Sequence, residues 1–319
     1  MKKYCIFASI FGVILVIAGA TMIGHYYSIG YDIDNIFSDG NSASVVDIGT
    51  VETTWTAVTE ILEETPYYNE STESHSRELS SVDTASINEI EIDASAAILN
   101  FYITYSDCIR INASGNGSNL VETNVSSGKL EIDYGTSDID FTDIKSVDLQ
   151  SVVNIADSAP EIDIYIPEGF GFENISIELA SGELTMSDII SNDIDIQIAA
   201  GNINLHRVNV SDSPDIELVA GEIMITSSYL NNLEIETVSG GDIYITECEL
   251  LGETKIDSVT GNTDIYNNLI SVDEYDFDIS VLTGNVRVNG SNNIPSNSSA
   301  PHKISISKVT GDVYIEFAE

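Results

Sequence analysis

Basic residues are the scarcest class of side chain in this protein. The chain of 319 residues holds 52 acidic and 11 basic side chains, so its formal net charge is −41. A surface this negative repels a phosphate backbone, which excludes nucleic acid as a natural partner. The same charge holds the chain away from anionic lipid. It favours solubility and partners that carry positive charge.

Cysteine and histidine are also few. The three cysteines are Cys5, Cys108 and Cys248. The last two belong to distant repeats, which predicts two buried free thiols rather than a disulfide. None of the four histidines stands at metal-ligand spacing from another His or Cys. No P-loop, G-x-S-x-G or H-E-x-x-H motif occurs either, so we predict that the chain is not an enzyme.

Residues 1–28 form a basic tip followed by an apolar run. Lys2 and Lys3 precede an uncharged stretch from Tyr4 to Ser28, which is long enough to cross a bilayer as a helix. The lysines are expected to stay in the cytoplasm, so the C-terminal part faces outward. A cleaved signal peptide is the alternative, because Ala18-Gly19-Ala20 resembles a cleavage site. The apolar run continues past that site, which favours a single-pass anchor in the cell membrane.

Residues 29–86 are polar, with Ser, Thr, Asn and Glu clusters as in NESTESHSRELSS. This composition predicts a solvated juxtamembrane linker. Within it, Trp55, Val58, Ile61 and Leu62 share one helical face, and Pro66 follows. The short helix predicted there would either cap the domain that follows or simply belong to the linker.

Residues 87–319 contain a sequence motif that occurs in seven copies, each with an isoleucine five residues before a glycine. A period near 20 residues with alternating apolar positions predicts stacked coils of β-structure. The fold class is therefore all-β, a single-stranded β-solenoid of the parallel β-helix type. The glycines fit sharp corners. The isoleucines are Ile177, Ile196, Ile216, Ile235, Ile256, Ile279 and Ile306, and the glycines are Gly182, Gly201, Gly221, Gly240, Gly261, Gly284 and Gly311.

Stacked coils place identical positions in columns. The isoleucines would form the spine of the core, and the residues that follow them would face outward. Carboxylate oxygens are ligands for hard cations, so we expect weak Ca²⁺ binding along the outward column. The calcium nonapeptide and EF-hand spacings are absent, and no dedicated cofactor is predicted. The residues concerned are Glu178, Glu217, Glu236 and Asp257.

The order of these segments resembles a known family. An anchor, the stretch SINEIEIDASAAILNFYIT, the stretch EIDIYIPEG and then the repeats are similar to the bacterial "putative adhesin" β-strand-repeat domain. LiaG-like membrane-anchored proteins of cell-envelope stress operons belong to the same group. The resemblance covers roughly residues 85 to 317. It implies a membrane-anchored β-solenoid with no established enzymatic role, and it provides no site residues.

Three functions are compatible with these patterns. The first is a non-enzymatic binding, adhesion or envelope-associated module whose ligand is a cationic group, a cell-wall polymer or a protein. The second is an exported polysaccharide-active enzyme that uses a carboxylate pair such as Glu217 with Glu236, or Asp195 with Asp215. The third is a structural surface protein that stacks end to end through an exposed terminal strand, GDVYIEF.

The prediction that the repeat isoleucines point into the core and the residues after them point outward can be tested by two neighbouring substitutions. Ile235→Asp is expected to destabilise the domain by several kcal/mol, because it buries an unpaired charge. Glu236→Ala is expected to change stability by no more than about 0.5 kcal/mol, because its side chain faces outward. Thermal unfolding of both variants measures the difference, and equal melting temperatures would contradict the assignment.

Overall fold

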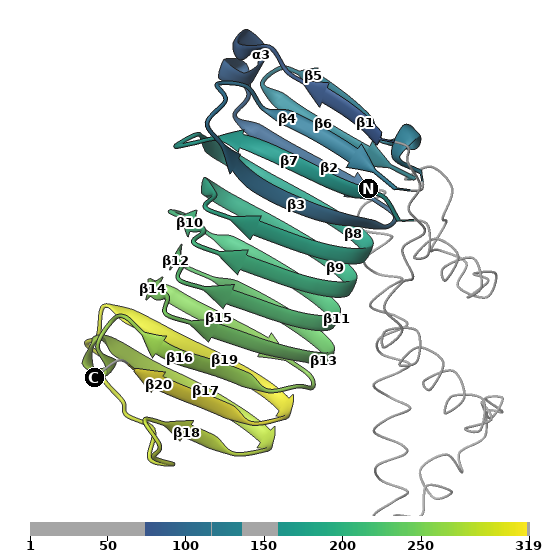
Figure 1. The fold of residues 1–319 in the computed structure, drawn as a ribbon. Coiled ribbons are helices and arrows are strands. Elements are labelled where there is room, and N and C mark those ends of the chain that lie inside the picture. The colour runs from purple at the N-terminus through teal and green to yellow at the C-terminus, as the bar shows by residue number, and fades with distance from the viewer. Residues whose placement is uncertain (1–73, 116, 136–158, 318–319) are drawn as a thin grey trace, which may run out of the picture. The chain divides into compact units, whose positions relative to one another are not determined.

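The computed structural model describes residues 74–115, 117–135 and 159–317 (Figure 1). Its described strands join into one 20-stranded sheet, which confirms the all-β prediction. The apolar N-terminal segment and the helix expected around Trp55 lie outside the described residues. Among the helices of the described ranges, none has the length and apolar character needed to cross a membrane.

The regular part of the sheet is a stack of coils that we call rungs. In the first rungs one long strand bends at the repeat glycine, and neighbouring strands pair in parallel and, except for one shift at a corner, in register. Short strands on a third side of the coil also pair in parallel. The predicted solenoid is therefore confirmed. The long strands are β8 (Gly171–Ser187), β9 (Ile190–His206), β11 (Pro214–Thr226) and β13 (Glu234–Thr246), and the short ones are β10 (Asn209–Val210), β12 (Tyr229–Asn231) and β14 (Glu249–Leu251).

The last three rungs do not stack in chain order. They consist of β15 (Glu253–Ser258) with β16 (Thr263–Asn268), β17 (Tyr275–Thr283) with β18 (Val286–Val288), and β19 (His302–Thr310) with β20 (Val313–Phe317). Strand β19 pairs with both β15 and β17, and β20 pairs with both β16 and β18. The final rung is thus inserted between the two that precede it.

This insertion corrects two expectations. Stacked repeats are expected to follow one another in chain order, and the sequence predicts that GDVYIEF is an exposed terminal strand. That segment contains β20, which is paired on both sides, and the terminal rung is β17–β18. The physical reason is that the rungs share one sequence motif. Ile256, Ile306 and Ile279 stay aligned in the inserted order, as they would in the sequential one.

The N-terminal end of the stack is covered differently. One rung, formed by β2 (Glu89–Ala94) and β3 (Ala97–Thr104), stacks on β8. On its other side, β2 pairs with β6 (Lys129–Tyr134) and β3 pairs with β7 (Glu161–Pro167). Antiparallel strands then close this end: β4 (Arg110–Ser114) on β7, β1 (Ser74–Glu78) on β4, and β5 (Glu122–Ser126) on β6. Helix α3 (Ser81–Ser86) lies beside them (Figure 1).

The domain therefore begins before residue 87, where the sequence placed its boundary. Residues 74–86 had been assigned to the linker, but they form β1 and α3. Leu79, between these two elements, is buried in the core, and its amide donates to the carbonyl of Ile109 at 2.9 Å.

The predicted isoleucine column exists and is longer than expected. Ile92 and Ile132 extend it beyond Ile177 at the N-terminal end. Six of the seven repeat isoleucines are fully buried, and Ile279 is only partly buried because its rung is the last of the stack. Each buried isoleucine contributes roughly 2 kcal/mol of hydrophobic free energy, so this column is a main element of the core.

Repeat glycines are needed because neighbouring corners approach very closely. A Cβ on Gly201, whose φ is +150°, would lie 1.6 Å from the carbonyl oxygen of Gly182. Gly240 was predicted to stand in this column, but it does not. Its φ is +63° and a Cβ there would meet nothing within 4 Å, while the carbonyl of Gly241 stacks against Gly261. One extra residue in this corner shifts the register between β11 and β13.

Alanine at these two glycines is expected to have unequal effects. Gly201→Ala should cost more than about 3 kcal/mol or prevent folding, because the methyl group must displace a backbone carbonyl. Gly240→Ala should cost only about 1 kcal/mol, the strain of a left-handed conformation in open space. Chemical denaturation of the two variants provides the comparison, and a Gly240→Ala cost as large as that of Gly201→Ala would refute the assignment.

Candidate functional site: an acidic face

The outward side of the strands that precede the repeat corners is almost entirely acidic. We call it the acidic face, and it consists of two adjacent columns. Parallel strands lie about 4.8 Å apart, which is shorter than the ~8 Å screening length at physiological salt, so the carboxylates repel one another. The columns are Asp133, Asp93, Glu178, Gln197, Glu217, Glu236 and Asp257, and Glu131, Glu91, Ser176, Asp195, Asp215, Glu234 and Lys255.

The four predicted cation ligands do fall in one column. Glu217, Glu236 and Asp257 occupy consecutive strands, but Gln197 separates Glu178 from them. In the part of the chain that the structure describes, no three His, Cys, Asp or Glu side chains form a group that could hold a metal ion. Weak cation binding along the column remains a prediction.

Two lysines lie at opposite ends of the acidic face. The Nζ atom of Lys129 lies 2.7 Å from both Glu131 and Glu91. The Nζ atom of Lys255 lies 2.5 Å from Glu234 and 3.0 Å from Asp257. The hydrogen bond that Lys129 donates to Glu131 raises the pKa of Lys129 above its usual range, and the one that Lys255 donates to Glu234 does the same for Lys255. Both ends of the face are therefore partly neutralised.

The centre of the face lacks such a partner. None of the salt bridges among the described residues includes Asp215 or Glu217. Partial burial raises the pKa of Asp215 to about 6, and Asp195 adds to the effect. Burial, followed by repulsion from Asp215, raises the pKa of Glu217 to about 7. Within the described residues, the ionised carboxylates of the face are least compensated by basic side chains here.

The carboxylate pairs considered for catalysis also lie on neighbouring strands. Asp195 is aligned with Asp215, and Glu217 is aligned with Glu236. The same strand spacing recurs along the whole face, however. Spacing alone therefore does not single out a reacting pair of carboxylates.

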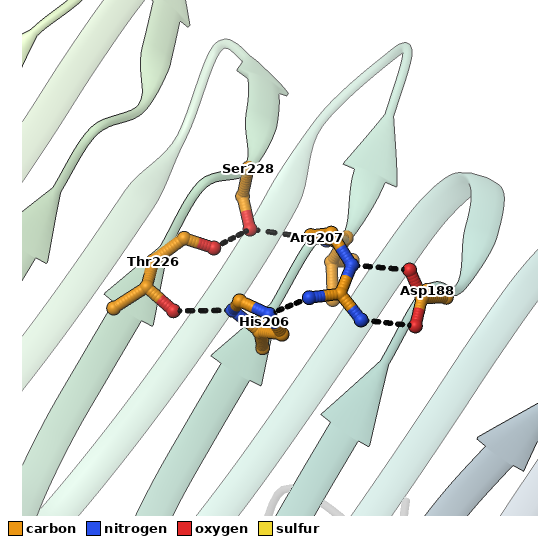
Figure 2. A network of polar contacts seen from close by, with 6 residues as sticks. Asp188, His206, Arg207, Thr226 and Ser228 are labelled. Atoms are coloured by element: carbon orange, nitrogen blue, oxygen red, sulfur yellow. Dashed lines mark hydrogen bonds and ion pairs between the residues drawn. The ribbon is translucent and has the colours of Figure 1, made fainter.

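A different polar network lies at the turns that follow β8, β9 and β11, as Figure 2 shows. Arg207 donates two hydrogen bonds to Asp188, at 2.5 and 2.6 Å, and also contacts His206. A ring nitrogen of His206 lies 2.8 Å from the hydroxyl of Thr226. Asp188 and Arg207 have positive φ, and their amides donate to the carbonyls of the next rung.

We interpret this network as a structural brace of the corner. The guanidinium of Arg207 holds the pKa of Asp188 below its usual value, since it stabilises the carboxylate. Ser228 continues the brace, because its hydroxyl donates to the carbonyl of Thr226 at 2.9 Å and accepts from the amide of Val208 at 3.0 Å. The histidines were considered as metal ligands in the sequence, and the contacts of His206 were missed; of these, the one with Thr226 joins residues about one repeat apart.

The two described cysteines, Cys108 and Cys248, are free thiols. Cys248 is buried, and burial raises its pKa to about 11, which makes it a weak nucleophile. Cys108 is only partly buried. The prediction of two buried free thiols is therefore right for Cys248 and wrong in exposure for Cys108.

With this geometry in view, comparison identifies the family. The chain belongs to the family described as Toastrack DUF4097, whose model matches residues 87–270. This result confirms the resemblance inferred from the repeats. No curated protein matches the chain.

Several solved structures are similar to the chain at low identity. One is described as a "putative adhesin" from Bacteroides fragilis, with 15% identity, a TM-score of 0.43 and coverage of 77% of this chain and 99% of that one. A second, from Parabacteroides distasonis, has 14% identity, a TM-score of 0.41 and coverage of 76% and 97%. A "putative cell adhesion protein" from Clostridium sporogenes has 10% identity, a TM-score of 0.35 and coverage of 77% and 99%.

The raised pKa of Glu217 predicts a pH dependence of stability. The folded pKa of about 7 exceeds the ordinary value of 4.5, so the protonated form favours the folded state. This stabilisation is present below about pH 4.5 and is lost as the pH rises through 7. The melting temperature should therefore rise between pH 8 and pH 5.5, and Glu217→Gln should flatten that change and be the more stable protein at pH 8.

Thermal unfolding followed by circular dichroism at several pH values measures this effect. Glu183→Gln is the matched control, because Glu183 is exposed and lies beyond the corner, off the acidic face. An unchanged pH profile in Glu217→Gln would show that this carboxyl group is not the source.

Proposed function

We propose that this Toastrack domain is a non-enzymatic binding module that presents its acidic face to cationic groups outside the cell. The observation that carries the proposal is the centre of the face. There, Asp215 and Glu217 are partly buried, have raised pKa values and form no salt bridge within the described residues. A bound cation would relieve this repulsion and lower the pKa of both carboxyl groups.

The parallel stack suits a ligand with repeated positive charges. Successive rungs hold carboxylates at a regular spacing on a single hydrogen-bonded sheet, so one extended ligand would contact several rungs without a change in the domain. Attraction of this kind speeds encounter and weakens as salt is added. Cationic peptides, basic protein segments and amine-bearing cell-wall polymers are the classes of ligand that fit.

Anchoring belongs to the same proposal. The uncharged segment from Tyr4 to Ser28, preceded by two lysines, supports a single membrane span with the repeats on the outer side. Residues 29–73 would then separate the acidic face from the membrane. In that position the domain would act in adhesion or as part of the cell envelope.

Binding can be measured with a fluorescent decalysine peptide and the full chain in a non-ionic detergent. The double substitution of Asp215→Asn with Glu217→Gln should weaken binding by roughly tenfold, because it removes the uncompensated charge. Glu183→Gln with Glu222→Gln is the control at pH 8, above the pKa values of Asp215 and Glu217, since it removes the same number of charges from parts of the strands that lie outside the face. Fluorescence anisotropy at low and high salt supplies the affinities.

Equal weakening by the two double variants would show that the peptide senses only net charge, and the acidic face would lose its role. Hydrolysis of a cell-wall or plant glycan that is lost in Glu217→Gln or Glu236→Gln would instead replace the binding proposal with an enzymatic one.

A further inference from the structure

The two ends of the stack differ in how they finish. At the N-terminal end, antiparallel strands and α3 cover the last parallel rung. At the C-terminal end, β17 pairs along one edge with β19 and has no partner strand on its other edge among the described residues. Along residues 276–283 this strand, which contains no Pro and no bulge, therefore has one edge that pairs with no other described strand.

The side chains of β17 show the same asymmetry. Ile306, in the neighbouring rung, is fully buried, whereas Ile279 and Val281 are only partly covered. Leu282 is 79% exposed. One further strand laid along β17 would complete the burial of the inward residues, as it does one rung earlier.

Strand β18 has a less accessible outer edge than β17. The chain turns back on it immediately, with an antiparallel bridge between Val288 and Ser291. Val288 is buried, and Ile294 of the following loop packs against the core. The open edge is therefore confined to β17.

We propose that β17 is a self-association edge, on which β17 of a second copy pairs in the antiparallel direction. The complete overlap of two strands Tyr275–Thr283 centres the pair on Ile279. This register places Ile279 against its own equivalent and Phe277 against Val281 of the second copy, so the inward residues of both strands face the same interior. A shift by one residue would bring inward residues opposite outward ones.

The charges on β17 agree with this register. Asp278 lies opposite Ser280 of the second copy, and Asp276 lies opposite Leu282, so no two carboxylates are directly opposed. Centring the pair on Phe277 would place Asp276 against Asp278, and centring it on Asp278 would place that residue against itself, both of which are unfavourable. A pair related by a two-fold axis closes at two copies and does not grow into a fibre.

The geometry gives a charge-reversal test at an exposed position. Leu282→Lys would place an ammonium group opposite Asp276 of the second copy, twice in each dimer, whereas Leu282→Glu would place a carboxylate there. Both substitutions leave the core intact, because Leu282 is 79% exposed. We expect the dimer of Leu282→Lys to dissociate on the order of tenfold less readily than that of Leu282→Glu.

Sedimentation equilibrium of the full chain in a non-ionic detergent measures the dissociation constants. Added salt should strengthen the dimer, since two acidic copies repel each other. The opposite salt dependence, predicted for decalysine on the acidic face, lets the two proposals fail separately. Met224→Lys against Met224→Glu is the control pair, because Met224 is an exposed residue of β11 in the middle of the stack.

Cross-linking tests the register. The double variant Asp278→Cys with Ser280→Cys places two thiols opposite each other on both sides of the central Ile279 pair, so it should form a disulfide-linked dimer in mild oxidant. Each single variant should form far less. A chain that stays monomeric at all salt concentrations, equal dissociation constants for the two Leu282 variants, or single variants that cross-link as well as the double one would each overturn the proposal.

Discussion

The close approach of stacked corners is the constraint on which the rest of this structure depends. At Gly182, Gly201 and Gly221 the corners approach so tightly that a single Cβ would overlap the carbonyl of the adjacent rung. That approach holds the strands on both sides of the corner at hydrogen-bonding distance. Because the register is then set, every position of the repeat is stacked on its equivalent, and the isoleucines form one interior.

The same register has a cost on the outer surface. A repeat that aligns isoleucines inside must align whatever stands beside them outside, and in this chain those residues are acids. Lys129 and Lys255 offset the repulsion at the ends of the face, whereas Asp215 and Glu217 accommodate it through raised pKa values. A sequence selected only for stability would replace these carboxylates with neutral side chains. Their presence in adjacent columns therefore has a cost in stability, and it is consistent with the cationic ligand that we propose.

The sequence was sufficient for the properties that follow from the repeat itself. The isoleucine column, the parallel winding and the alignment of Glu217 with Glu236 all follow from one sequence motif of constant length. The stacking order of the last rungs could not be predicted in this way. Rungs with the same sequence motif stack equally well in either order, and the segments that connect them determine which order forms. Gly240 was misplaced because Gly241 beside it is chemically identical. The brace of Arg207 and Asp188 was missed because the two residues lie 19 residues apart. The local sequence around each of them predicts only a turn.

The inserted rung also bears on how the stack is completed. In chain order β17–β18 precedes β19–β20, yet among the described strands β17 and β18 are joined to the stack through β19 and β20. Before β19 and β20 have folded, β17 has two options. It has no partner strand, or it pairs with the edge of β15, where Ile279 would align with Ile256 just as well as it does with Ile306. In the second case, insertion of the final rung would separate two edges that already match. The other edge of β17 pairs with no strand of the described residues, and it lies at the opposite end of the stack from the antiparallel cap.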